Sequence, residues 1–273
     1  MSNVKLPVTY LFVPGNRPER FEKALASGAD AVILDLEDAV SPRDKEQARD
    51  NVRQWAESHR DAEERLVVRI NDGTTPWYAA DLVLLRNAGV RFAMLPKAET
   101  AEQVDAVRAT LPPEANVLPI IETARGVDNV EAVALAEGVL RLTFGTLDYG
   151  VDLDLSGDER GLLYPAARIA HASRGAGLPS PVYGVTPAID DDERLLADLA
   201  FARAFGFGAK LCIHPRQVAV IRTAMVPTAA EIDWAKRVLA ASEGAEGAFQ
   251  IDGKMVDRPV MLKAKAILVR APG

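Results

Sequence analysis

Two acidic residues stand where apolar runs of this chain end. Glu122 closes the run ANVLPIIETA, and Asp148 closes VLRLTFGTLD, the next apolar run along the chain. If the runs are adjacent strands, the two carboxylates lie about 4.8 Å apart and repel each other unless a cation lies between them. Mg²⁺ takes oxygen ligands and is often held by one or two carboxylates. We therefore predict a Mg²⁺ site on Glu122 and Asp148; the alternative is a carboxylate pair salt-bridged to Arg69 or Arg125.

Other charged residues also follow apolar runs. Arg69 closes VVRIN, and its planar guanidinium suits a substrate carboxylate or a developing oxyanion. The alternative for Arg69 is a fixed structural pair with Glu37. Glu37 and Asp38 follow Asp35 in LDLED, and we expect at least one of the three acids to be structural. Glu37 and Asp38 are also candidates for orienting Arg69, Lys97 or a metal-bound water.

Further candidates for substrate binding lie in three of the connecting loops. Lys97 follows the run VRFAML and is expected to pair with a carboxylate or an anionic ligand, a Schiff base being the alternative. Asn71 ends the same apolar run as the VVRIN arginine. Arg17 and Arg20 flank Pro18 at the start of a helix, which would make a cradle for a phosphate. The alternative is that both are ordinary surface arginines.

Three other features are expected to be structural. His214 stands beside Pro215 at a helix start, and a lone histidine is more often structural than catalytic. Cys212 lies inside an apolar run and is predicted to be in the core. The acidic segment 152–158, DLDLSGD, lacks the spacing of an EF-hand and reads as a solvated loop.

The elements that must position these residues form a repeating pattern. A short apolar run ends in polar residues, a longer amphipathic segment follows, and several of these segments end near a glycine. Helix starts are predicted at Ser41-Pro42, at Thr100 with Gln103 as a capping box, and at Asp190 to Asp192. The apolar runs are 8–16, 29–38, 65–72, 90–99, 115–124, 139–148, 181–188 and 209–215.

Eight such repeats predict an α/β fold of the (β/α)₈ TIM-barrel type, in which the strands are covered on both faces. A doubly wound open sheet is the alternative, but VPGNRP has one glycine where a dinucleotide-binding loop needs three. In a barrel the carboxyl ends of the strands form the active face, where the candidate residues gather. Pro119 is unexpected inside a central strand because it lacks a backbone donor.

After residue 222 the repeat stops. We predict a catalytic barrel domain over 1–224 and a small helical and hairpin lid over 225–273. The lid is expected to hold a helix over 228–243, a hairpin at Asp252-Gly253 and a last helix or strand at KAKAILVR. The segment reads as too small to bury a core of its own.

Composition excludes several classes of protein. The formal charge is −7, so non-specific nucleic-acid binding through Lys and Arg is not expected. Cys212 is the only cysteine, which excludes an internal disulfide and a cysteine-rich zinc site. The first residues do not resemble a secretory signal, and no run approaches about 18 apolar residues. We expect a cytoplasmic protein without a membrane span.

Six segments occur in one order and together resemble the HpcH/HpaI aldolase and citrate lyase β-subunit family. They are LFVPGNRPERFEKALASGADAVILDLEDAV, VVRIN, LPKAE, LPIIETARGV, FGTLDYGVDL and CIHP. The resemblance covers nearly the whole chain. It implies a (β/α)₈ barrel, Mg²⁺, and the making or breaking of a carbon–carbon bond in acyl thioesters.

The resemblance also implies roles for individual residues. Arg69, Glu122 and Asp148 match the family's substrate and metal residues. Arg17 and Arg20, with Pro215, match the thioester side of the site. GKMVDRP resembles the C-terminal lid of malyl-CoA lyase-like members, whose aspartate, matching Asp257, reaches the active site of an adjacent subunit. The alternative for Asp257 is a turn residue before Pro259.

The expected function is therefore a Mg²⁺-dependent lyase. Its substrate would be a 3-hydroxy-acyl thioester of citramalyl-CoA, malyl-CoA or citryl-CoA type, with a 2-oxo acid and an acyl-CoA as small-molecule partners. One alternative is a β subunit that needs a citrate lyase complex and a carrier-protein thioester. A 2-oxo acid aldolase is disfavoured, since the pyruvate-using members place a histidine at the position of Asp38. A site completed by Asp257 of a neighbour implies a homo-oligomer, either a trimer or a hexamer.

Overall fold

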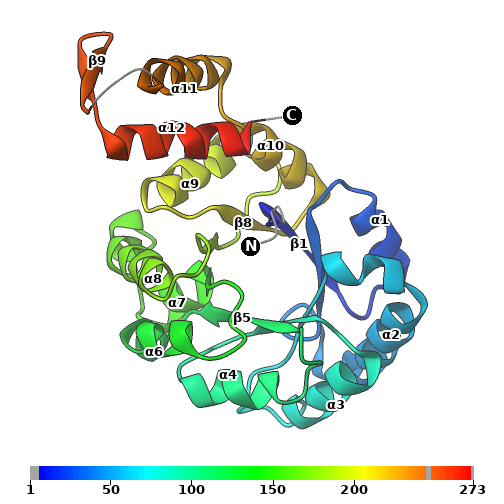
Figure 1. Cartoon of the computed structure of the whole chain (residues 1–273). Helices are drawn as coiled ribbons and strands as arrows, with labels where there is room; N and C mark the ends of the chain where they lie inside the picture. The colour runs from blue at the N-terminus through cyan, green and yellow to red at the C-terminus, as the bar shows by residue number, and fades with distance from the viewer. Residues whose placement is uncertain (1–5, 244–246, 272–273) are drawn as a thin grey trace. The chain divides into compact units, whose positions relative to one another are not determined.

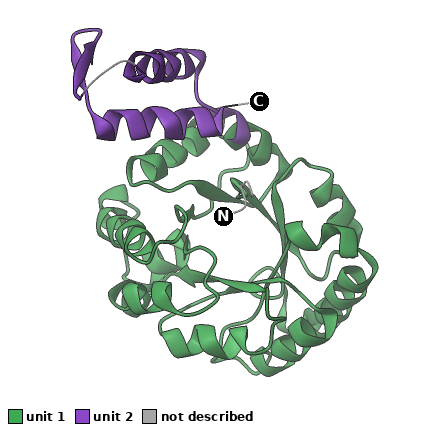
Figure 2. Ribbon diagram, viewed as in Figure 1, with its two compact units in different colours: residues 1–221 green, residues 222–273 purple. Residues whose placement is uncertain are grey.

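The computed structural model of the chain describes residues 6–243 and 247–271. The chain divides into two compact units, residues 1–221 and residues 222–273 (Figure 2). The functional boundary that we placed after residue 224 stays a prediction.

The first unit is a closed barrel of eight parallel strands in the order of the chain, so the predicted (β/α)₈ barrel is confirmed. Each of the eight apolar runs contains one strand. The strands are β1 (Thr9–Pro14), β2 (Ala31–Asp35), β3 (Leu66–Arg69), β4 (Phe92–Leu95), β5 (Asn116–Ile121), β6 (Thr143–Phe144), β7 (Val182–Tyr183) and β8 (Ala209–Cys212).

Helices form a ring around these strands (Figure 1). The α-helices are α1 (Phe21–Leu25), α2 (Lys45–Ser58), α3 (Tyr78–Ala88), α4 (Ala101–Arg108), α5 (Ala124–Asp128), α6 (Val130–Leu135), α7 (Thr146–Asp152), α8 (Leu163–Gly175), α9 (Asp192–Ala204) and α10 (Pro215–Met225). The 3₁₀ helices are η1 (Pro18–Arg20), η2 (Pro42–Asp44), η3 (Arg60–Arg65) and η4 (Glu159–Leu162).

The inside of the barrel is a packed apolar core, which explains why the strands read as apolar runs. Alternate residues of the strands meet there, as the two-residue period of a strand requires. The buried members of this cluster are Tyr10, Ala31, Ile33, Val67, Met94, Leu118, Ile120, Val182, Ala209 and Leu211. Intervening residues such as Val32 and Leu34 are also fully buried, so both faces of the sheet are covered.

Pro119 lies within β5 opposite Leu95 of β4. On the other side of β5, Val117 pairs with Val139 and Ile120 pairs with Thr143. The two pairs are three residues apart along β5 but four residues apart along the facing segment. The facing segment therefore contains one extra residue, which defines a β-bulge. The missing donor of Pro119 falls where this ladder is interrupted, and a bulge is one of the few places where a sheet tolerates proline.

Two of the three predicted helix starts show the predicted capping chemistry, and the third, at Ser41, does not. Thr100 forms a capping box with Gln103 at the start of α4, and the Asp191 side chain caps α9. Ser41 precedes η2 with Pro42 at its first position, but its hydroxyl donates to the Asp44 carboxylate and does not cap the backbone.

The second unit contains a hairpin and two helices. The hairpin pairs β9 (Phe249–Ile251) with β10 (Lys254–Val256) through a turn whose residues Asp252 and Gly253 both have positive φ. The helix predicted over 228–243 is confirmed as α11 (Ala229–Ser242), and KAKAILVR is helical, within α12 (Arg258–Arg270).

We expected this segment to bury no core of its own, and that was wrong. A cluster made only of its own residues is buried: Ala235, Val238, Val256, Ala264 and Ile267. Alanines at two of these positions allow α11 and α12 to approach closely.

Among the described residues, no helix is both long and apolar enough to cross a membrane.

Candidate active site

Arg69 lies at the end of β3 and is held by two carboxylates that follow or end β2. Its Nε and Nη2 atoms each donate to Asp35 at 2.7 Å, and its Nη1 atom lies 2.8 Å from Glu37 Oε2. The Arg69 side chain is only 11% exposed. Burial opposes its charge, but Asp35 and then Glu37 outweigh that effect and raise the pKa of Arg69. The guanidinium is therefore a fixed positive charge at the active face.

The two acids beside Arg69 differ in their protonation. Burial opposes ionisation of Asp35, but the Arg69 pair outweighs it and lowers the pKa of that carboxyl. Burial raises the pKa of Glu37 to about 7, because it outweighs the opposing charge of Arg69; the charges of Asp38 and Asp35 add to the rise. Asp38 itself is 62% exposed and lies 3.8 Å from Arg69. Asp35 is thus the structural member of the acidic segment, and Glu37 is poised to exchange a proton near neutral pH.

Glu122 follows β5 and is only 3% exposed. Its Oε1 atom accepts the backbone N–H of Lys97 at 2.8 Å. The space beside its other oxygen depends on Gly145, because a Cβ at residue 145 would lie 2.2 Å from Glu122 Oε2. A main-chain donor and the absence of a side chain at residue 145 therefore set the orientation of this carboxylate.

Asp148 lies in the first turn of α7, directly after β6. Burial raises the pKa of Glu122 to about 8, and the charges of Glu37 and Asp148 add to this effect. A buried carboxylate next to other carboxylates needs a proton or a cation. The residues present therefore fit a divalent cation on Glu122 and Asp148.

The types of ligand at this position limit which cation could bind. Among residues 6–243 and 247–271, no group of three or more His, Cys, Asp or Glu side chains is arranged to hold a metal. Two carboxylates fit Mg²⁺, which keeps several waters and often takes ligands from its substrate. A closed all-protein cage, as for structural zinc, does not fit this site.

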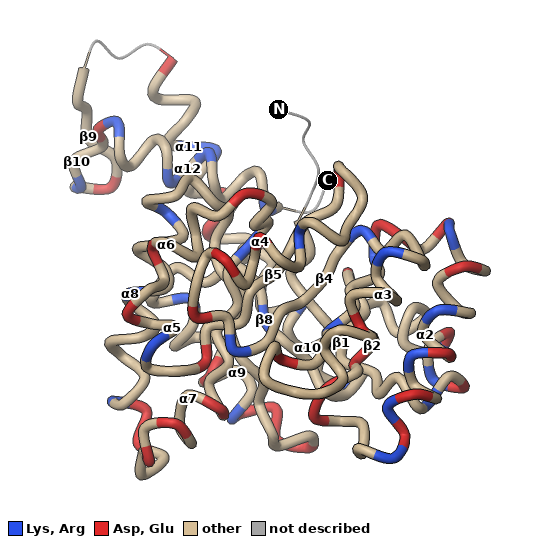
Figure 3. Tube along the Cα trace, turned by 90° about the horizontal axis from the view of Figure 1, so that it is seen from below, with Lys and Arg blue, Asp and Glu red and all other residues tan. Residues whose placement is uncertain are grey.

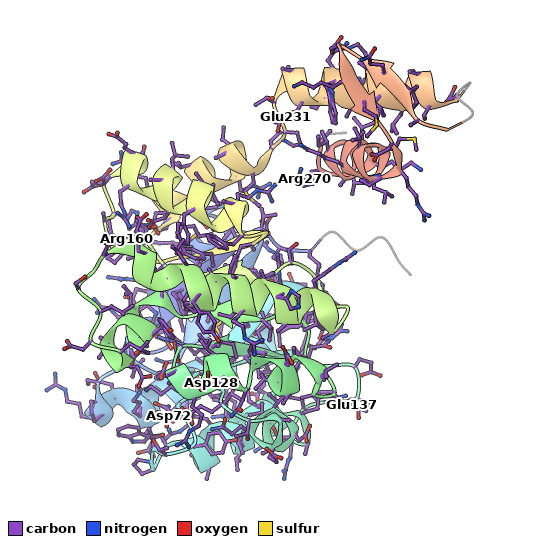
Figure 4. All side chains as sticks on the ribbon, turned by 90° about the vertical axis from the view of Figure 1, so that its left-hand side faces the viewer. Asp72, Asp128, Glu137, Arg160, Glu231 and Arg270 are labelled. Carbon is purple, nitrogen blue, oxygen red and sulfur yellow. The ribbon has the colours of Figure 1, made fainter. Side chains whose placement is uncertain are left out.

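The ammonium of Lys97 lies between two carboxylates, since its Nζ atom is 3.4 Å from Asp72 and 3.6 Å from Glu37. Asp72, labelled in Figure 4, is itself held by the hydroxyl and N–H of Thr74. The Lys97 side chain is 41% exposed, so its ammonium is open to an anionic ligand. Burial opposes its charge, but Glu37 and Asp72 outweigh that effect and raise the pKa of Lys97. A raised pKa opposes the neutral amine that Schiff-base formation needs.

Asn71 lies near this site, but its side chain is already occupied. The amide oxygen accepts the ammonium of Lys45 at 2.6 Å, and the amide nitrogen donates to Asp81 at 2.6 Å. The residue is 1% exposed. These bonds occupy its side chain and so disfavour the contact with substrate that we predicted, which stays a prediction.

The sequence patterns did not single out Lys45 or Gly145. Lys45 is buried on the same face of α2 as Ala48 and Val52. The sequence did contain a signal for a buried Lys45, because a lysine on the apolar face of a helix must find partners for its charge. Gly145 had no signal beyond its place before the acidic turn, because its importance comes from a contact between two strands.

The residues predicted for the thioester side are exposed. The side chains of Arg17 and Arg20 are 51% and 54% exposed, and each lies 3.8 Å from Glu19. Pro215 is the first residue of α10, and His214 before it accepts the N–H of Arg216. Exposed cations at strand ends are available to a phosphate, and their roles stay predictions.

Two residues were assigned contrasting roles. Asp257 belongs to the second unit, where its carboxylate caps α12 by accepting the N–H of Val260. Its predicted catalytic role is untested by this contact. Cys212 is fully buried, as predicted for a core residue.

A cavity of about 480 Å³ is lined in part by α7, and Arg69, Glu122 and Asp148 are not among its lining residues. The predicted solvated loop contributes Asp154, Leu155 and Asp158 to its lining. Asp158 pairs with Arg160, and Asp152 accepts the N–H of Ala124. All of residues 152–158 except Leu155 are exposed, as predicted for a solvated loop.

Figure 3 shows Lys and Arg interspersed with Asp and Glu along the barrel unit. Positive charge that could attract an anion is therefore local, at residues such as Arg69 and Lys97.

Comparisons with known proteins agree with this geometry. The sequence pattern of the HpcH/HpaI aldolase/citrate lyase family matches residues 9–215, and that of the C–C bond lyases of the TIM-barrel fold matches residues 168–272. A citrate lyase subunit beta-like protein of Mycobacterium tuberculosis is 40% identical over 270 residues, covering 96% of this chain and 94% of that protein.

A second relative, the (3S)-malyl-CoA thioesterase of Cereibacter sphaeroides, is 33% identical over 96% of this chain and 93% of its own length. The solved structure of the protein CitE from Mycobacterium tuberculosis, in complex with magnesium, acetoacetate and coenzyme A, superposes with a TM-score of 0.85. That structure is 37% identical in sequence and covers 98% of this chain and 99% of its own.

Proposed function

The chain belongs to the HpcH/HpaI aldolase/citrate lyase family, and from this membership and its site we propose that it is a Mg²⁺-dependent carbon–carbon lyase. The proposed substrate is a 3-hydroxy-acyl thioester of citramalyl-CoA, malyl-CoA or citryl-CoA type. It is cleaved to, or formed from, a 2-oxo acid and an acyl-CoA. The observation that carries the proposal is the convergence of Arg69, Glu122 and Asp148 at the carboxyl ends of β3, β5 and β6.

Glu122 and Asp148 are the residues that would hold the metal ion. The bound ion supplies Lewis-acid chemistry toward the oxygens of the oxo-acid half. Support for a cation at this position comes from the raised pKa of Glu122, to about 8, caused by burial and then by Glu37 and Asp148. The M. tuberculosis CitE structure named above holds magnesium and an oxo acid, acetoacetate.

In the cleavage direction the substrate loses the proton of its 3-hydroxyl, and the bond between C2 and C3 breaks. The oxygen becomes the carbonyl of the 2-oxo acid, and the electron pair of the broken bond moves to C2 and the thioester. Arg69 stabilises the negative charge on the oxygen before the bond breaks. Glu37, with a pKa raised to about 7 by burial, is placed beside Arg69 to hold the hydroxyl proton.

The carbon that gains the electron pair then needs a proton. We assign this transfer to Asp257 of a neighbouring subunit, on the resemblance of GKMVDRP to the lid of malyl-CoA lyase-like members. The ammonium of Lys97 and the exposed guanidinium groups of Arg17 and Arg20 are assigned to the anionic parts of the thioester substrate. Pro215 is assigned to the same side of the site.

The test is an assay of citramalyl-CoA, malyl-CoA and citryl-CoA with the isolated chain, in Mg²⁺ and in EDTA. We expect turnover of at least one thioester in Mg²⁺ and its loss in EDTA. The Arg69→Lys variant keeps the charge but loses the planar fork, so its kcat should fall on the order of 10²-fold. Turnover that EDTA leaves unchanged would remove the metal from the proposal.

A second candidate, thioester hydrolysis, is favoured by the relative named (3S)-malyl-CoA thioesterase. Product analysis in the same assay separates the two reactions. Carbon–carbon cleavage of malyl-CoA releases glyoxylate and acetyl-CoA, whereas hydrolysis releases malate and free CoA. Free CoA with no 2-oxo acid would replace the lyase proposal by the hydrolase.

A third candidate follows from the similarity to a citrate lyase subunit beta-like protein: a catalytic subunit that needs other subunits for activity. The isolated chain would then be inactive on CoA thioesters and active on a carrier-protein thioester beside the other subunits. Turnover of a CoA thioester by the isolated chain would contradict this dependence.

A further inference from the structure

We infer that Lys45 is a positioning residue, whose buried ammonium group locks the ends of β2 and β3 together and so fixes Glu37 against Arg69. The inference deepens the proposed function and rests on it, because it assigns a part in the same site to a residue outside the predicted set.

The ammonium of Lys45 is buried and uses all of its donors. Only 5% of the residue is exposed. The Nζ atom donates to the backbone carbonyls of Leu36 at 2.6 Å and Glu37 at 2.8 Å, and to the amide oxygen of Asn71 at 2.6 Å. An ammonium group has three donors, and a buried one is costly unless they are paired. The three acceptors are therefore constrained to stay around one point.

These acceptors belong to the ends of two strands. Leu36 and Glu37 directly follow β2, and the N–H of Leu36 donates to the carbonyl of Arg69, the last residue of β3, at 2.9 Å. Asn71 lies two residues beyond Arg69. Lys45 thus bridges the segment that carries Glu37 and the segment that carries Arg69.

A closed ring of side chains supports this bridge. The backbone N–H and amide of Asn71 both donate to one oxygen of Asp81 on α3, at 2.8 and 2.6 Å. The other oxygen of Asp81 pairs at 3.3 Å with Arg49, one turn after Lys45 on α2. The ring from Lys45 through Asn71 and Asp81 to Arg49 ties two helices to the strand ends, so the ammonium cannot move alone.

Glu37 is positioned by its main chain as well as by its charged neighbours Arg69 and Lys97. Its Oε2 atom lies 2.8 Å from Arg69 Nη1 and forms an ion pair with it. The angle between the two groups is unfavourable for a hydrogen bond, and no other described residue donates one to this oxygen.

The main chain of Glu37 is held by Asp35 at its N–H, and by Lys45 and the N–H of Val40 at its carbonyl. Loss of the ammonium would leave that carbonyl with the local turn bond from Val40 alone, and would remove the link from the Glu37 segment to Asn71.

The experiment compares Lys45→Met with two controls on the same segment. Val52→Ala opens a cavity at a buried position of α2 outside the ring, and Arg43→Met removes an exposed positive charge near Lys45. In crystal structures we expect Glu37 to move relative to Arg69 by about 1 Å in Lys45→Met and to stay in place in both controls. A displacement of that size costs about 10²-fold in catalysis.

The kinetic readout separates positioning from stability. In Lys45→Met we expect kcat to fall on the order of 10²-fold, with KM for the thioester within about twofold of wild type. Val52→Ala, at a matched loss of thermal stability, should keep a kcat within about twofold of wild type. If Lys45→Met does not fold, Lys45→Gln, which keeps two amide donors, takes its place, with a smaller displacement expected.

Unchanged positions of Glu37 and Arg69 in the Lys45 variant would overturn the inference. So would a fall in kcat no larger than that of Val52→Ala. If the wild-type chain turns over no thioester, the proposed function fails, and the crystal structures still decide the role of Lys45.

Discussion

Glu122 is the residue on which the metal proposal depends most directly. The carboxyl is buried and lies near the charges of Glu37 and Asp148, and in that order these raise its pKa to about 8. At neutral pH a metal-free chain therefore carries a proton on Glu122. Any cation that binds there must displace that proton.

The first prediction is a pH dependence of Mg²⁺ binding. Below about pH 8 the affinity should fall by up to about tenfold per pH unit, because one proton is displaced for each ion bound. Calorimetry in two buffers with different heats of ionisation measures the released proton. Glu122→Gln is the control, in which both the binding and the proton release should be lost. An affinity that is flat between pH 6 and pH 8 would contradict the assignment.

The same raised pKa predicts the stability of the metal-free chain. A carboxyl that holds its proton more tightly when folded stabilises the fold at low pH and loses that contribution as pH rises from about 4.5 to about 8. Thermal melts in EDTA should therefore show this component in the wild type and not in Glu122→Gln. Asp35 acts in the opposite direction, since Arg69 overcomes its burial and lowers its pKa, so the comparison with Glu122→Gln isolates the effect of one residue.

Gly145 is the subject of a third prediction at this scale. In Gly145→Ala the new Cβ would lie 2.2 Å from Glu122 Oε2, so the carboxylate or α7 must shift. We expect Mg²⁺ affinity to fall at least about tenfold, measured by titration calorimetry. Gly150→Ala is the matched control on the same helix, because its Cβ meets nothing within 4 Å. Equal affinities in the two variants would contradict the proposed orientation of Glu122.

At this scale the residue types were predictable, and their partners were predictable only in part. Arg69, Glu37, Glu122 and Asp148 were identified because charged residues follow apolar strands. The pair of Arg69 with Glu37, considered as the alternative, is present at 2.8 Å, but the two-pronged pair with Asp35 was not predicted. A register between strands decides that choice, and register is not visible in the local pattern.

At the scale of elements, the loop after β4 places two separate contacts in one residue, Lys97. Lys97 has a φ of +46°, a left-handed conformation that costs a non-glycine residue roughly 1–2 kcal/mol. That conformation turns its backbone N–H toward Glu122 while its side chain faces Asp72 and Glu37. Under the proposed function, the main chain would orient the metal ligand Glu122, and the side chain would bind the substrate.

A fourth prediction separates these functions. Lys97→Gly should keep Mg²⁺ affinity within about threefold, since the donor is in the backbone, and raise KM for the thioester on the order of tenfold. Lys97→Ala loses the same side chain but keeps the left-handed cost, so it should be about 1 kcal/mol less stable than Lys97→Gly. Calorimetry and thermal melts measure the two effects. Loss of Mg²⁺ binding in Lys97→Gly would contradict the backbone assignment.

The elements themselves were predictable where the physics is local. Thr100 caps α4 through a box with Gln103, which requires only four consecutive residues. Strand lengths were not predictable, and β6 and β7 are only two residues long inside runs of ten and eight. A strand ends where its neighbour stops pairing, and Pro119 shows this, since its place is explained only by the bulge beside it.

At the scale of the whole molecule, the eightfold repeat was sufficient to predict the barrel, because closure satisfies every strand edge. The second unit was less predictable. Its buried cluster uses the small side chains of Ala235 and Ala264, which carry little hydrophobic signal in the sequence. The two helices pack closely enough to form a core, which the small size of the segment did not lead us to expect.

The fifth prediction concerns the assembly. If Asp257 acts on the site of a neighbour, then Asp257→Ala and Arg69→Ala chains, each inactive alone, should recover part of the activity when mixed. Statistical mixing of a fully shared site leaves at most about a quarter of the sites intact. Native mass spectrometry confirms the mixed oligomers. Mixed oligomers without recovered activity would place Asp257 in the site of its own chain or outside catalysis.

The left-handed backbone at Lys97 has a consequence for how this site can diversify. The donor to Glu122 belongs to a part of the residue that every amino acid except proline possesses. The 97th side chain can therefore change without removing that donor, and glycine, asparagine or aspartate would also relax the backbone. Under the proposed roles, substrate preference and metal binding would be separable at one position, and a change of residue 97 would alter the preferred thioester while metal binding is kept.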